Sequence, residues 1–579
     1  MEGKMRELLR FLKDYRKESV LAPLFKLLEA SFELFVPLVM AKMIDDGIVS
    51  RDYGIIAGMG AVLVLLAAIG LAASLTAQYF AAKAAVGFSA RLKQELFHHI
   101  QTLSFSDMDQ VGTSTMITRM TSDANQVQSG VNLVLRLFMR SPFIVVGAMI
   151  MAFTIDVKAA LVFVVAIPLL CLVVFGVMLA SIPLYKKVQA ALDQILGRTR
   201  ENLTGARVLR AFNKQEEENR QFTGENEILY HVQMVVGRIA ALMNPITYII
   251  INVAVIVLIW IGAIQVDGGL LTQGEVVALV NYMSQILVEL VKLANLIVTV
   301  NKAVACGNRI QEIFERKPGL TEPEETKQED PAAEETVVFD HVGLAYPGTS
   351  ENALTDITFS VKKGDTVGVI GGTGSGKTSL VHLIPRFYDI TEGNLRIDGQ
   401  DVAGYPLQRL RSKVGIVLQK SVLFQGTIRS NLLWGKPDAM EEEMWKALRI
   451  AQAEEVVKKK KAGLDEPVEQ EGRNFSGGQR QRLAIARALV RQPEILILDD
   501  SASALDYATD AALRRAIREE LTDMTVFIVS QRAASVRNAD QIVVLEDGEM
   551  AGLGNHQELM AACGVYREIY ESQYGKEAH

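Results

Sequence analysis

The stretch of sequence that decides the fold is TVGVIGGTGSGKTS at residues 366–379. Its first five residues are mostly β-branched and apolar, as in a buried strand, and residues 379–384 favour a helix. Between them lies the pattern G-x-x-x-x-G-K-T at residues 371–378, whose glycines let successive backbone N–H groups point at phosphate oxygens. We expect Lys377 to reach the β- and γ-phosphates and Thr378 to ligate Mg²⁺. The stretch predicts a nucleoside triphosphate site.

A second apolar run ends in two carboxylates. Residues 495–498 read ILIL and are followed directly by Asp499 and Asp500. Four apolar residues are typical of a buried parallel strand, and the carboxyl ends of such strands face the ligand crevice. We therefore expect Asp499 to hold the metal ion through water.

Composition divides the chain into two unlike halves. Of the 579 residues, 49% are hydrophobic and 22% are charged, which excludes a disordered or fibrous protein. The net charge of −7 combines +2 over residues 1–300 with −9 over residues 301–579. Three cysteines are too few for a disulfide scaffold or a cysteine-based zinc site, and no basic domain indicates nucleic acid as a partner.

The first half contains long apolar stretches. A helix needs about 20 mostly apolar residues to cross the hydrocarbon of a bilayer. Six stretches meet or approach that length, which predicts a transmembrane domain over residues 19–314 in a lipid bilayer. The six predicted spans are residues 20–42, 55–80, 131–154, 158–181, 243–265 and 276–300.

The distribution of Lys and Arg orients these spans. Basic residues are concentrated in the N-terminal 17 residues and in the connection 182–242, whereas the turn at residues 267–269 has none. Both termini are therefore expected in the cytoplasm, and residues 1–18 are expected to form an interfacial amphipathic helix. The connections 81–130 and 182–242 have helical periodicity, so we expect helices that continue out of the bilayer.

A few charged residues lie inside the predicted spans. A charge near the bilayer centre costs about 2.5–3.5 kcal/mol on insertion scales, so such residues usually face a cavity. Pairing within one helix near a membrane edge is the alternative, and the sequence does not separate the two. The residues are Lys26, Glu29, Glu33, Arg136, Arg140, Glu289 and Lys292.

A change of composition separates the two halves. Residues 315–335 are rich in Pro, Glu, Thr and Lys, which is typical of a solvated acidic linker. The remaining residues, 336–579, contain the phosphate-loop pattern and form the predicted nucleotide-binding domain.

A third motif identifies a family. The run NFSGGQRQR at residues 474–482 resembles the signature of ABC proteins, with Phe475 in place of the usual leucine. With six spans before it, the whole chain is similar to an ABC exporter half-transporter. The resemblance implies a multi-domain membrane protein: an all-α six-helix transmembrane domain with long cytoplasmic helical extensions, and an α/β P-loop NTPase domain of the ABC type. It also implies ATP and Mg²⁺ as cofactors.

The resemblance assigns roles residue by residue. It implies that two nucleotide-binding domains close head to tail, so that one chain's signature contacts ATP held by its partner. Segments 105–112 and 205–212 match the coupling helices that dock on these domains. The implied ATP-binding residues are Tyr346, Gly371, Gly372, Thr373, Gly374, Ser375, Gly376, Lys377, Thr378 and Ser379. The implied signature residues, which act on the partner's ATP, are Phe475, Ser476, Gly477, Gly478 and Gln479. The implied Mg²⁺ ligands are Thr378, Gln419 and Asp499, and the implied interdomain residues are Ser503 and Asp506.

Two positions depart from the family pattern. The family places glutamate after the metal-binding aspartate, where this chain has Asp500, one methylene shorter. The family places histidine in the switch segment, where this chain has Gln531, which cannot carry the proton or charge of an imidazole. Loss at both catalytic positions resembles the degenerate-site subunit of a heterodimeric multidrug-type exporter.

The expected function is therefore a subunit of an ATP-driven exporter of amphipathic drugs, lipids or peptides in a bacterial cytoplasmic membrane. Its expected partner is a second ABC half-transporter that carries the competent site. Two alternatives share every motif: an importer of a metal chelate with the exporter fold, and an ATP-gated channel or regulatory membrane ATPase.

Overall fold

The computed structural model describes residue 5 and residues 7–320, 334–349, 351–501 and 504–574. The chain divides into two compact units, each with its own core. Unit 1 comprises residues 1–101 and 114–316, and unit 2 comprises residues 102–113 and 317–579. Ser503 and residues 321–333 of the predicted linker lie outside the described residues.

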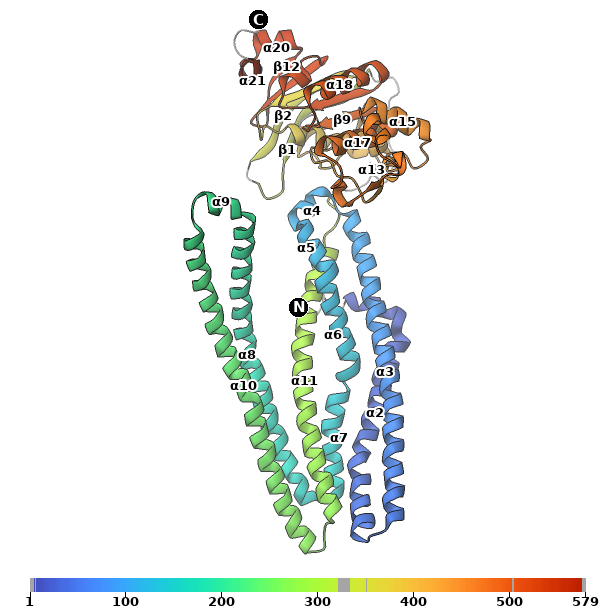
Figure 1. Ribbon diagram of the computed structural model, residues 1–579, viewed down its shortest axis with the longest axis vertical. Helices are drawn as coiled ribbons and strands as arrows, with labels where there is room; N and C mark the ends of the chain where they lie inside the picture. The colour runs from blue at the N-terminus through green and yellow to red at the C-terminus, as the bar shows by residue number, and fades with distance from the viewer. Residues whose placement is uncertain (1–4, 6, 321–333, 350, 502–503, 575–579) are drawn as a thin grey trace. The chain divides into compact units, whose positions relative to one another are not determined.

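Unit 1 is built from long helices (Figure 1). Three of them, α3, α8 and α10, are 50, 48 and 53 residues long. The elements are η1 Leu9–Tyr15, α2 Arg16–Lys42, η2 Met43–Val49, α3 Tyr53–Thr102, α5 Thr113–Thr118, η3 Arg119–Asp123, α6 Ala124–Leu137, α7 Arg140–Ile155, α8 Val157–Thr204, α9 Ala206–Ala211, α10 Gln215–Asp267 and α11 Gln273–Phe314.

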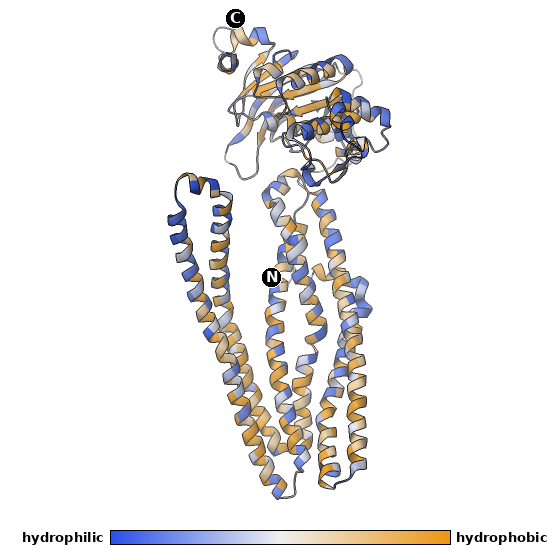
Figure 2. Cartoon of the chain, viewed as in Figure 1, coloured by the Kyte–Doolittle hydropathy of each residue, from blue (hydrophilic) through white to orange (hydrophobic). Residues whose placement is uncertain are grey.

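Five helical runs of the described residues are long and apolar enough to cross a membrane. They contain the second to sixth predicted spans: Tyr53–Thr102, Thr113–Ile155, Val157–Thr204, Gln215–Asp267 and Gln273–Phe314. Figure 2 shows apolar residues along most of these helices and more polar residues toward the end of α8 and α10 that carries α9. Helix α2, which holds the first predicted span, is not among the five, since it carries Lys26, Glu29 and Glu33. That α2 also crosses the bilayer stays a prediction.

The third predicted span is interrupted near its middle. Helix α6 ends at Leu137 and α7 begins at Arg140. Pro142 explains the interruption, because proline has no N–H to donate to the carbonyl of residue 138 and its ring crowds that carbonyl. The sequence prediction gave the span 131–154 and did not include this turn.

The predicted helical connections are confirmed, since helices α3, α8 and α10 continue far beyond their apolar parts. The interfacial helix over residues 1–18 stays a prediction. Among the described residues of this segment, Leu9–Tyr15 forms a 3₁₀ helix, and Leu8 and Phe11 are buried. The Phe11 ring lies 6.1 Å from that of Phe314 on α11, so packing inside unit 1 takes up these apolar side chains.

Unit 2 contains a six-stranded sheet with a parallel centre and a four-stranded antiparallel sheet. The larger sheet has the order β12-β11-β3-β10-β9-β6 and the smaller the order β2-β1-β4-β5. The strands are β1 Glu335–Ala345, β2 Asn352–Lys362, β3 Thr366–Gly371, β4 Glu392–Ile397, β5 Gln400–Asp401, β6 Val414–Val417, β7 Gly426–Thr427, β8 Pro467–Val468, β9 Ile495–Asp499, β10 Thr525–Val529, β11 Gln541–Glu546 and β12 Glu549–Gly554.

Helices cover the sheets of unit 2, and short α4 belongs to this unit. The two strands predicted from the sequence, β3 and β9, are both present and flank β10, so their carboxyl ends meet at one edge. The helices are α4 Phe105–Val111, α12 Lys377–Leu383, η4 Val402–Gly404, α13 Leu407–Lys413, α14 Ile428–Leu433, α15 Glu441–Ile450, α16 Glu454–Lys458, η5 Gly463–Asp465, η6 Gln470–Gly472, α17 Gly477–Val490, α18 Tyr507–Glu520, α19 Ala533–Val536, α20 His556–Ala562 and α21 Gly564–Tyr574.

Candidate functional site

The phosphate loop connects β3 to α12, as the sequence predicts. Gly374 and Gly376 have φ of +85° and +91°, in the left-handed region that favours glycine. A side chain at Gly376 would also meet the Ala353 carbonyl at 2.8 Å and Leu354 Cδ2 at 2.7 Å. The loop can therefore curl tightly only because this position carries no Cβ.

The ammonium group of Lys377 lies inside this curl. Its Nζ donates to the carbonyl oxygen of Gly371 at 3.0 Å, contacts the carbonyl of Gly372 and lies 3.3 Å from Ser375 Oγ. The residue is only 9% exposed. Burial lowers the pKa of Lys377, and the charges of Asp500 and Asp499 oppose that shift. A buried cation among backbone dipoles is suited to receive phosphate oxygens.

Two oxygen ligands suitable for Mg²⁺ lie next to this cation. Thr378 Oγ1 donates a hydrogen bond to Asp499 Oδ1 at 3.0 Å, although the two residues come from different elements. Asp499 is 1% exposed at the end of β9. Magnesium prefers hard oxygen ligands and retains several waters, so a hydroxyl and one carboxylate fit this ion.

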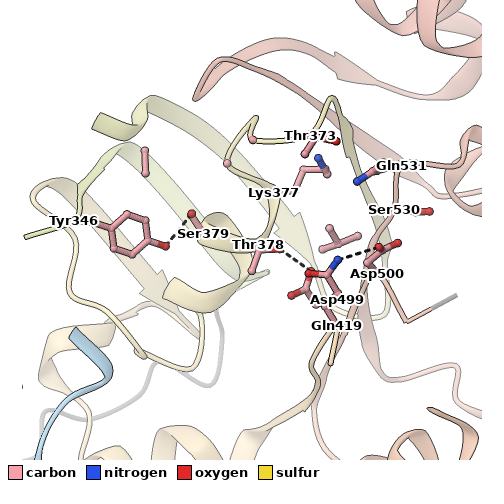
Figure 3. Close-up of a pocket in the computed structure, with 14 residues that line it drawn as sticks. Tyr346, Thr373, Lys377, Thr378, Ser379, Gln419, Asp499, Asp500, Ser530 and Gln531 are labelled. Carbon is pink, nitrogen blue, oxygen red and sulfur yellow. Dashed lines mark hydrogen bonds between the residues drawn. The ribbon is translucent and has the colours of Figure 1, made fainter. Parts of the chain in front are cut away.

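Asp500 follows Asp499 at the edge of the sheet. Its φ of +44° places it in the left-handed region, which aspartate tolerates better than most residues. Gln419 Nε2 donates to Asp500 Oδ2 at 3.4 Å (Figure 3). Burial and the neighbouring Asp499 charge raise the pKa of Asp500, while Gln419, Arg532 and Lys377 oppose the shift. Asp500 therefore supplies a carboxylate at this edge of the sheet, and its hydrogen bond connects it to the loop that carries Gln419.

These residues line one cavity of ≈340 Å³ in unit 2 (Figure 3). Eleven of the sequence-predicted residues are in its wall: Tyr346, Thr373, Gly374, Gly376, Lys377, Thr378, Ser379, Gln419, Asp499, Asp500 and Gln531. The other predicted loop residues, Gly371, Gly372 and Ser375, are not among the residues that line it. The lining also includes Ala353, Val529 and Ser530, which the sequence prediction did not select. Because Val529 ends β10, the rule that parallel strands deliver ligand groups at their carboxyl ends was a usable signal for Ser530.

Tyr346 forms one end of this cavity. Its hydroxyl group lies 2.9 Å from Ser379 Oγ, and burial raises the pKa of its phenol. The Tyr388 ring meets it edge to face, with centroids 5.0 Å apart and planes at 89°. The tyrosine therefore has a fixed position at the cavity, as an aromatic platform requires.

The signature residues are organised around the start of α17. Ser476 caps this helix: its N–H donates to Gln479 Oε1 at 3.1 Å and its Oγ accepts from the Gln479 N–H at 3.4 Å. Phe475 is 3% exposed in the core, which explains how it replaces a leucine. Among the described residues, none of the signature lines the phosphate-loop cavity; Gly477 lines a different one of ≈430 Å³ with Glu471.

Other predicted positions have local roles in the structure. Asp506 caps α18 by accepting from the Thr509 N–H at 2.8 Å. The segment 105–112 forms α4, capped by Ser104, and Phe105 packs on Phe387 with centroids 4.5 Å apart. The segment 205–212 forms α9 in unit 1, and its docking stays a prediction.

Tyr388 is a residue that the sequence prediction missed. Its ring contacts Tyr346, and its hydroxyl donates to Asp109 Oδ2 on α4 at 2.7 Å. Burial raises the pKa of Tyr388, and the Asp109 carboxylate raises it further. A single side chain therefore joins the cavity wall to α4, and nothing in the local sequence pattern identifies it.

Comparisons with known proteins agree with this arrangement. Residues 19–290 match the family described as ABC transporter transmembrane region, and residues 354–503 match the family described as ABC transporter. The ABC transporter ATP-binding protein YfiB of Bacillus subtilis is 36% identical over 573 residues, covering 99% of each chain. YgaD of the same strain, named as a candidate multidrug export ATP-binding/permease protein, is 32% identical over 587 residues, again covering 99% of each.

A solved structure has the same fold. The ATP-bound structure of a bacterial Atm1-family ABC exporter superposes with a TM-score of 0.79 over 97% of this chain and 99% of that one, at 23% identity. The chain therefore belongs to the ABC transporter family, as an exporter-type half-transporter whose transmembrane domain is fused to a nucleotide-binding domain with ATPase activity coupled to transport.

Proposed function

We propose that this chain is one subunit of a heterodimeric exporter, and that it binds ATP tightly and hydrolyses it slowly at its own phosphate loop. The observation that carries the proposal is the wall of the cavity. There an intact phosphate loop faces Asp500 and Gln531, at the two positions where the family places glutamate and histidine.

The binding role rests on the loop and its neighbours. Lys377 and the loop N–H groups receive the phosphates, and Tyr346 stacks on the adenine. Thr378 and Asp499 hold Mg²⁺, and Gln419, which lines the same cavity, senses it. When bound, this ion neutralises phosphate charge and makes the γ-phosphate more electrophilic.

The slow step follows from two side chains. A carboxylate one methylene short, held by Gln419, is retracted from the water that it must polarise. Positioned general bases contribute about 10²–10⁴-fold to rates, so much of this factor is lost. Gln531 can donate or accept a hydrogen bond, but it cannot carry a proton as histidine does.

The second site belongs to a partner. The N-terminus of α17, with Ser476, Gly477, Gly478 and Gln479, receives the γ-phosphate of ATP that is held by a second half-transporter. Asp506 contacts this partner, and Ser503, which lies outside the described residues, has the same predicted role. The partner carries the glutamate and histidine, so its turnover drives most of the alternating access.

The proposed substrates are amphipathic drugs, lipids or peptides. Support comes from the apolar helical runs of unit 1 and from YgaD, which is named for multidrug export. The proposed location is a bacterial cytoplasmic membrane, with both termini inside because the basic residues lie at the inner ends.

ATPase measurements test the proposal. The full chain is purified in nanodiscs, alone and with a second half-transporter that carries glutamate after its metal-binding aspartate. We expect ATP binding without sustained turnover for the chain alone and steady turnover for the pair. Replacing the partner's catalytic glutamate by glutamine is the matched control and should remove that turnover. Full steady turnover by the chain alone would contradict the proposal.

Transport is measured in inside-out vesicles that contain the pair. Accumulation of an amphipathic fluorescent compound should require ATP hydrolysis. Equal passive flux with a non-hydrolysable ATP analogue would instead indicate a channel.

A further inference from the structure

Unit 1 contains a network of charges that joins three helices around a buried pair, Arg140 and Glu289. Arg140 on α7 donates through Nη1 to Glu289 Oε1 on α11 at 2.5 Å, and through Nη2 to Glu33 Oε2 on α2 at 2.6 Å. Arg140 and Glu289 are 7% and 3% exposed. Pairing across helices, rather than within one helix near a membrane edge, therefore explains Arg140.

This network lies deep in the predicted spans. Glu33, Arg140 and Glu289 each fall within about three residues of the centre of spans 20–42, 131–154 and 276–300. Ionised groups at such depth are costly unless they are paired or face water. Glu289 meets this condition fully, since Ser141 Oγ donates to its second oxygen at 2.8 Å and Lys292 Nζ lies 2.9 Å from its first.

The charges inside the three predicted spans do not balance. Away from the span ends, the three helical runs carry four cations, Lys26, Arg136, Arg140 and Lys292, against three carboxylates, Glu29, Glu33 and Glu289. Lys26 pairs with Glu29, and the other two carboxylates pair with Arg140 and Lys292. The surplus positive charge is Arg136.

Arg136 has no partner among the described residues. No carboxylate in that part of the chain lies within ion-pair distance of its guanidinium, and its Nε is buried without a hydrogen-bond acceptor. The Nε of Arg140, in a side chain more than nine-tenths buried, also lacks an acceptor. A buried donor without an acceptor costs free energy of folding, and here two such donors lie four residues apart. This indicates that a bound anion accepts hydrogen bonds from them.

Helix geometry brings Lys292 to the same level as Arg136. The two helical runs are antiparallel: Arg140 contacts Glu289, a side chain at Gly130 would meet Ala303, and Asp123 accepts from Arg309 at 2.6 Å. Arg136 lies four residues before Arg140. Phe138 and Met139 between them keep right-handed helical backbone angles, so the displacement is still about 6 Å along the axis. Lys292 lies three residues after Glu289, or about 4.5 Å. Both displacements run toward the same end of the helices, which is the predicted cytoplasmic end. The Lys292 side chain is 43% exposed and can reach a ligand there.

We propose that Arg136 and Lys292, backed by Arg140, form a site for the anionic head group of an amphipathic substrate. This inference rests on the proposed export of amphipathic compounds and adds their charge. A carboxylate or phosphate head accepts from the two cations, and the apolar tail lies along the apolar helices. The Arg140–Glu289 pair keeps the site in place, and the Nε–H of Arg140 is a further donor for the head group.

Binding to the full chain in nanodiscs of phosphatidylcholine tests the site. The probes are 11-(dansylamino)undecanoate and the singly dansylated, protonated 1,11-diaminoundecane, which share a fluorophore and a tail and differ in head charge. Fluorescence titrations are corrected with empty nanodiscs. Arg136→Gln should weaken the anionic probe by about tenfold or more, because hydrogen bonds to charged groups contribute that much, and should leave the cationic probe unchanged.

Matched variants separate charge from packing. Arg136→Lys should retain most of the affinity, and Lys292→Gln should weaken the anionic probe in the same direction. Lys158→Gln, an exposed cation at the start of α8, should have no effect. Unchanged anion binding in Arg136→Gln, or an equal loss for both probes, would overturn the proposal.

A bilayer lipid could supply the same anionic chemistry, so a second arm replaces part of the phosphatidylcholine by phosphatidylglycerol. The substrate site predicts that the anionic probe still binds. Loss of probe binding, together with phosphatidylglycerol retained by the wild-type chain and not by Arg136→Gln in native mass spectrometry, would assign the site to lipid and overturn the proposal.

Transport into vesicles tests the anion site and the export function separately. ATP-dependent uptake of the cationic probe with no Arg136-dependent preference for the anionic probe would refute the site alone. Arg136-dependent binding of the anion with no ATP-dependent uptake of either probe would refute the export function and leave the site standing.

Discussion

The amide of Gln419 donates a hydrogen bond to the carboxylate of Asp500, with Nε2 and Oδ2 3.4 Å apart (Figure 3). Gln419 follows β6 and Asp500 follows β9, so the contact joins two loops at the edge of one sheet. It holds the shortened carboxylate at the cavity wall, where the family has a longer one. Restoring the longer side chain therefore tests the proposed loss of hydrolysis directly.

Restoring both family residues should raise ATP hydrolysis at this site. Asp500→Glu with Gln531→His is expected to increase turnover by about ten- to a hundredfold, part of the 10²–10⁴ that a positioned base supplies. Steady-state phosphate release by the full chain measures it. Adding Lys377→Ala to the double variant is the control and should abolish the gain. An unchanged rate would mean that other residues limit hydrolysis.

Asp500 should make stability depend on pH. Its pKa is raised in the folded chain by burial and by the charge of Asp499, so the folded state holds the proton to higher pH than the unfolded state. The free energy of unfolding therefore falls as the pH rises from the pKa of Asp500 in the unfolded chain to its higher pKa in the folded chain. Above that interval it stays at the lower value. Asn is neutral throughout, so Asp500→Asn should raise the thermal midpoint at pH 7.5 by about 1–3 °C.

That gain should shrink as the pH falls toward 4, because the raised pKa of Asp500 lets the wild-type carboxyl take up its proton in the folded chain before the unfolded chain does. Differential scanning fluorimetry of the full chain without nucleotide measures both values. Asp547→Asn is the matched control, since Asp547 is exposed and also has a positive φ, +47°. A gain that is larger at pH 4 than at pH 7.5 would contradict the assigned direction.

Two glycines of the phosphate loop should respond differently to alanine. Gly376→Ala combines a φ of +91° with a contact to the Ala353 carbonyl, so it should cost about 1–3 kcal/mol and weaken binding of a fluorescent ATP analogue at least tenfold. A side chain at Gly372 meets no atom within 4 Å, so Gly372→Ala should change stability by less than about 0.5 kcal/mol. Chemical unfolding measures the stability of both variants, and a nucleotide titration measures their affinity for the ATP analogue. Equal effects on stability would refute the geometric argument.

The contact between Tyr388 and α4 should affect coupling more than binding. Tyr388→Phe removes the 2.7 Å hydrogen bond to Asp109 and keeps the ring beside Tyr346, whereas Phe105→Ala removes the ring packed on Phe387. We expect nucleotide affinity within about twofold of wild type for Tyr388→Phe, because one exposed polar contact contributes little. Stimulation of ATP hydrolysis by a transported compound should fall several-fold in both variants. Full stimulation in both would show that this contact carries no coupling.

Much of unit 2 follows from local sequence. The strand, loop and first helical turn around Lys377 are contiguous, and the glycine positions fix the backbone there, so the motif predicts its own geometry. The same holds for β9 and its carboxylates, and for the long helices of unit 1, whose apolar lengths exceed those of ordinary helices. The turn before Arg140 had a local signal in Pro142 that the span prediction did not use.

Tertiary structure alone decided the contacts between distant segments. The sequence named Arg140, Glu33 and Glu289 as charges in spans, but their pairing joins residues that are 107 and 149 positions apart. Tyr388 reaches Asp109 over 279 positions, and Gln419 reaches Asp500 over 81. Local propensity is set by neighbours along the chain, so the sequence determined a phosphate loop, apolar helices and a shortened carboxylate. Helix packing decides which charges neutralise one another, and it leaves Arg136 without a carboxylate among the described residues. Only packing brings a donor to its acceptor and removes the water that would otherwise replace that acceptor.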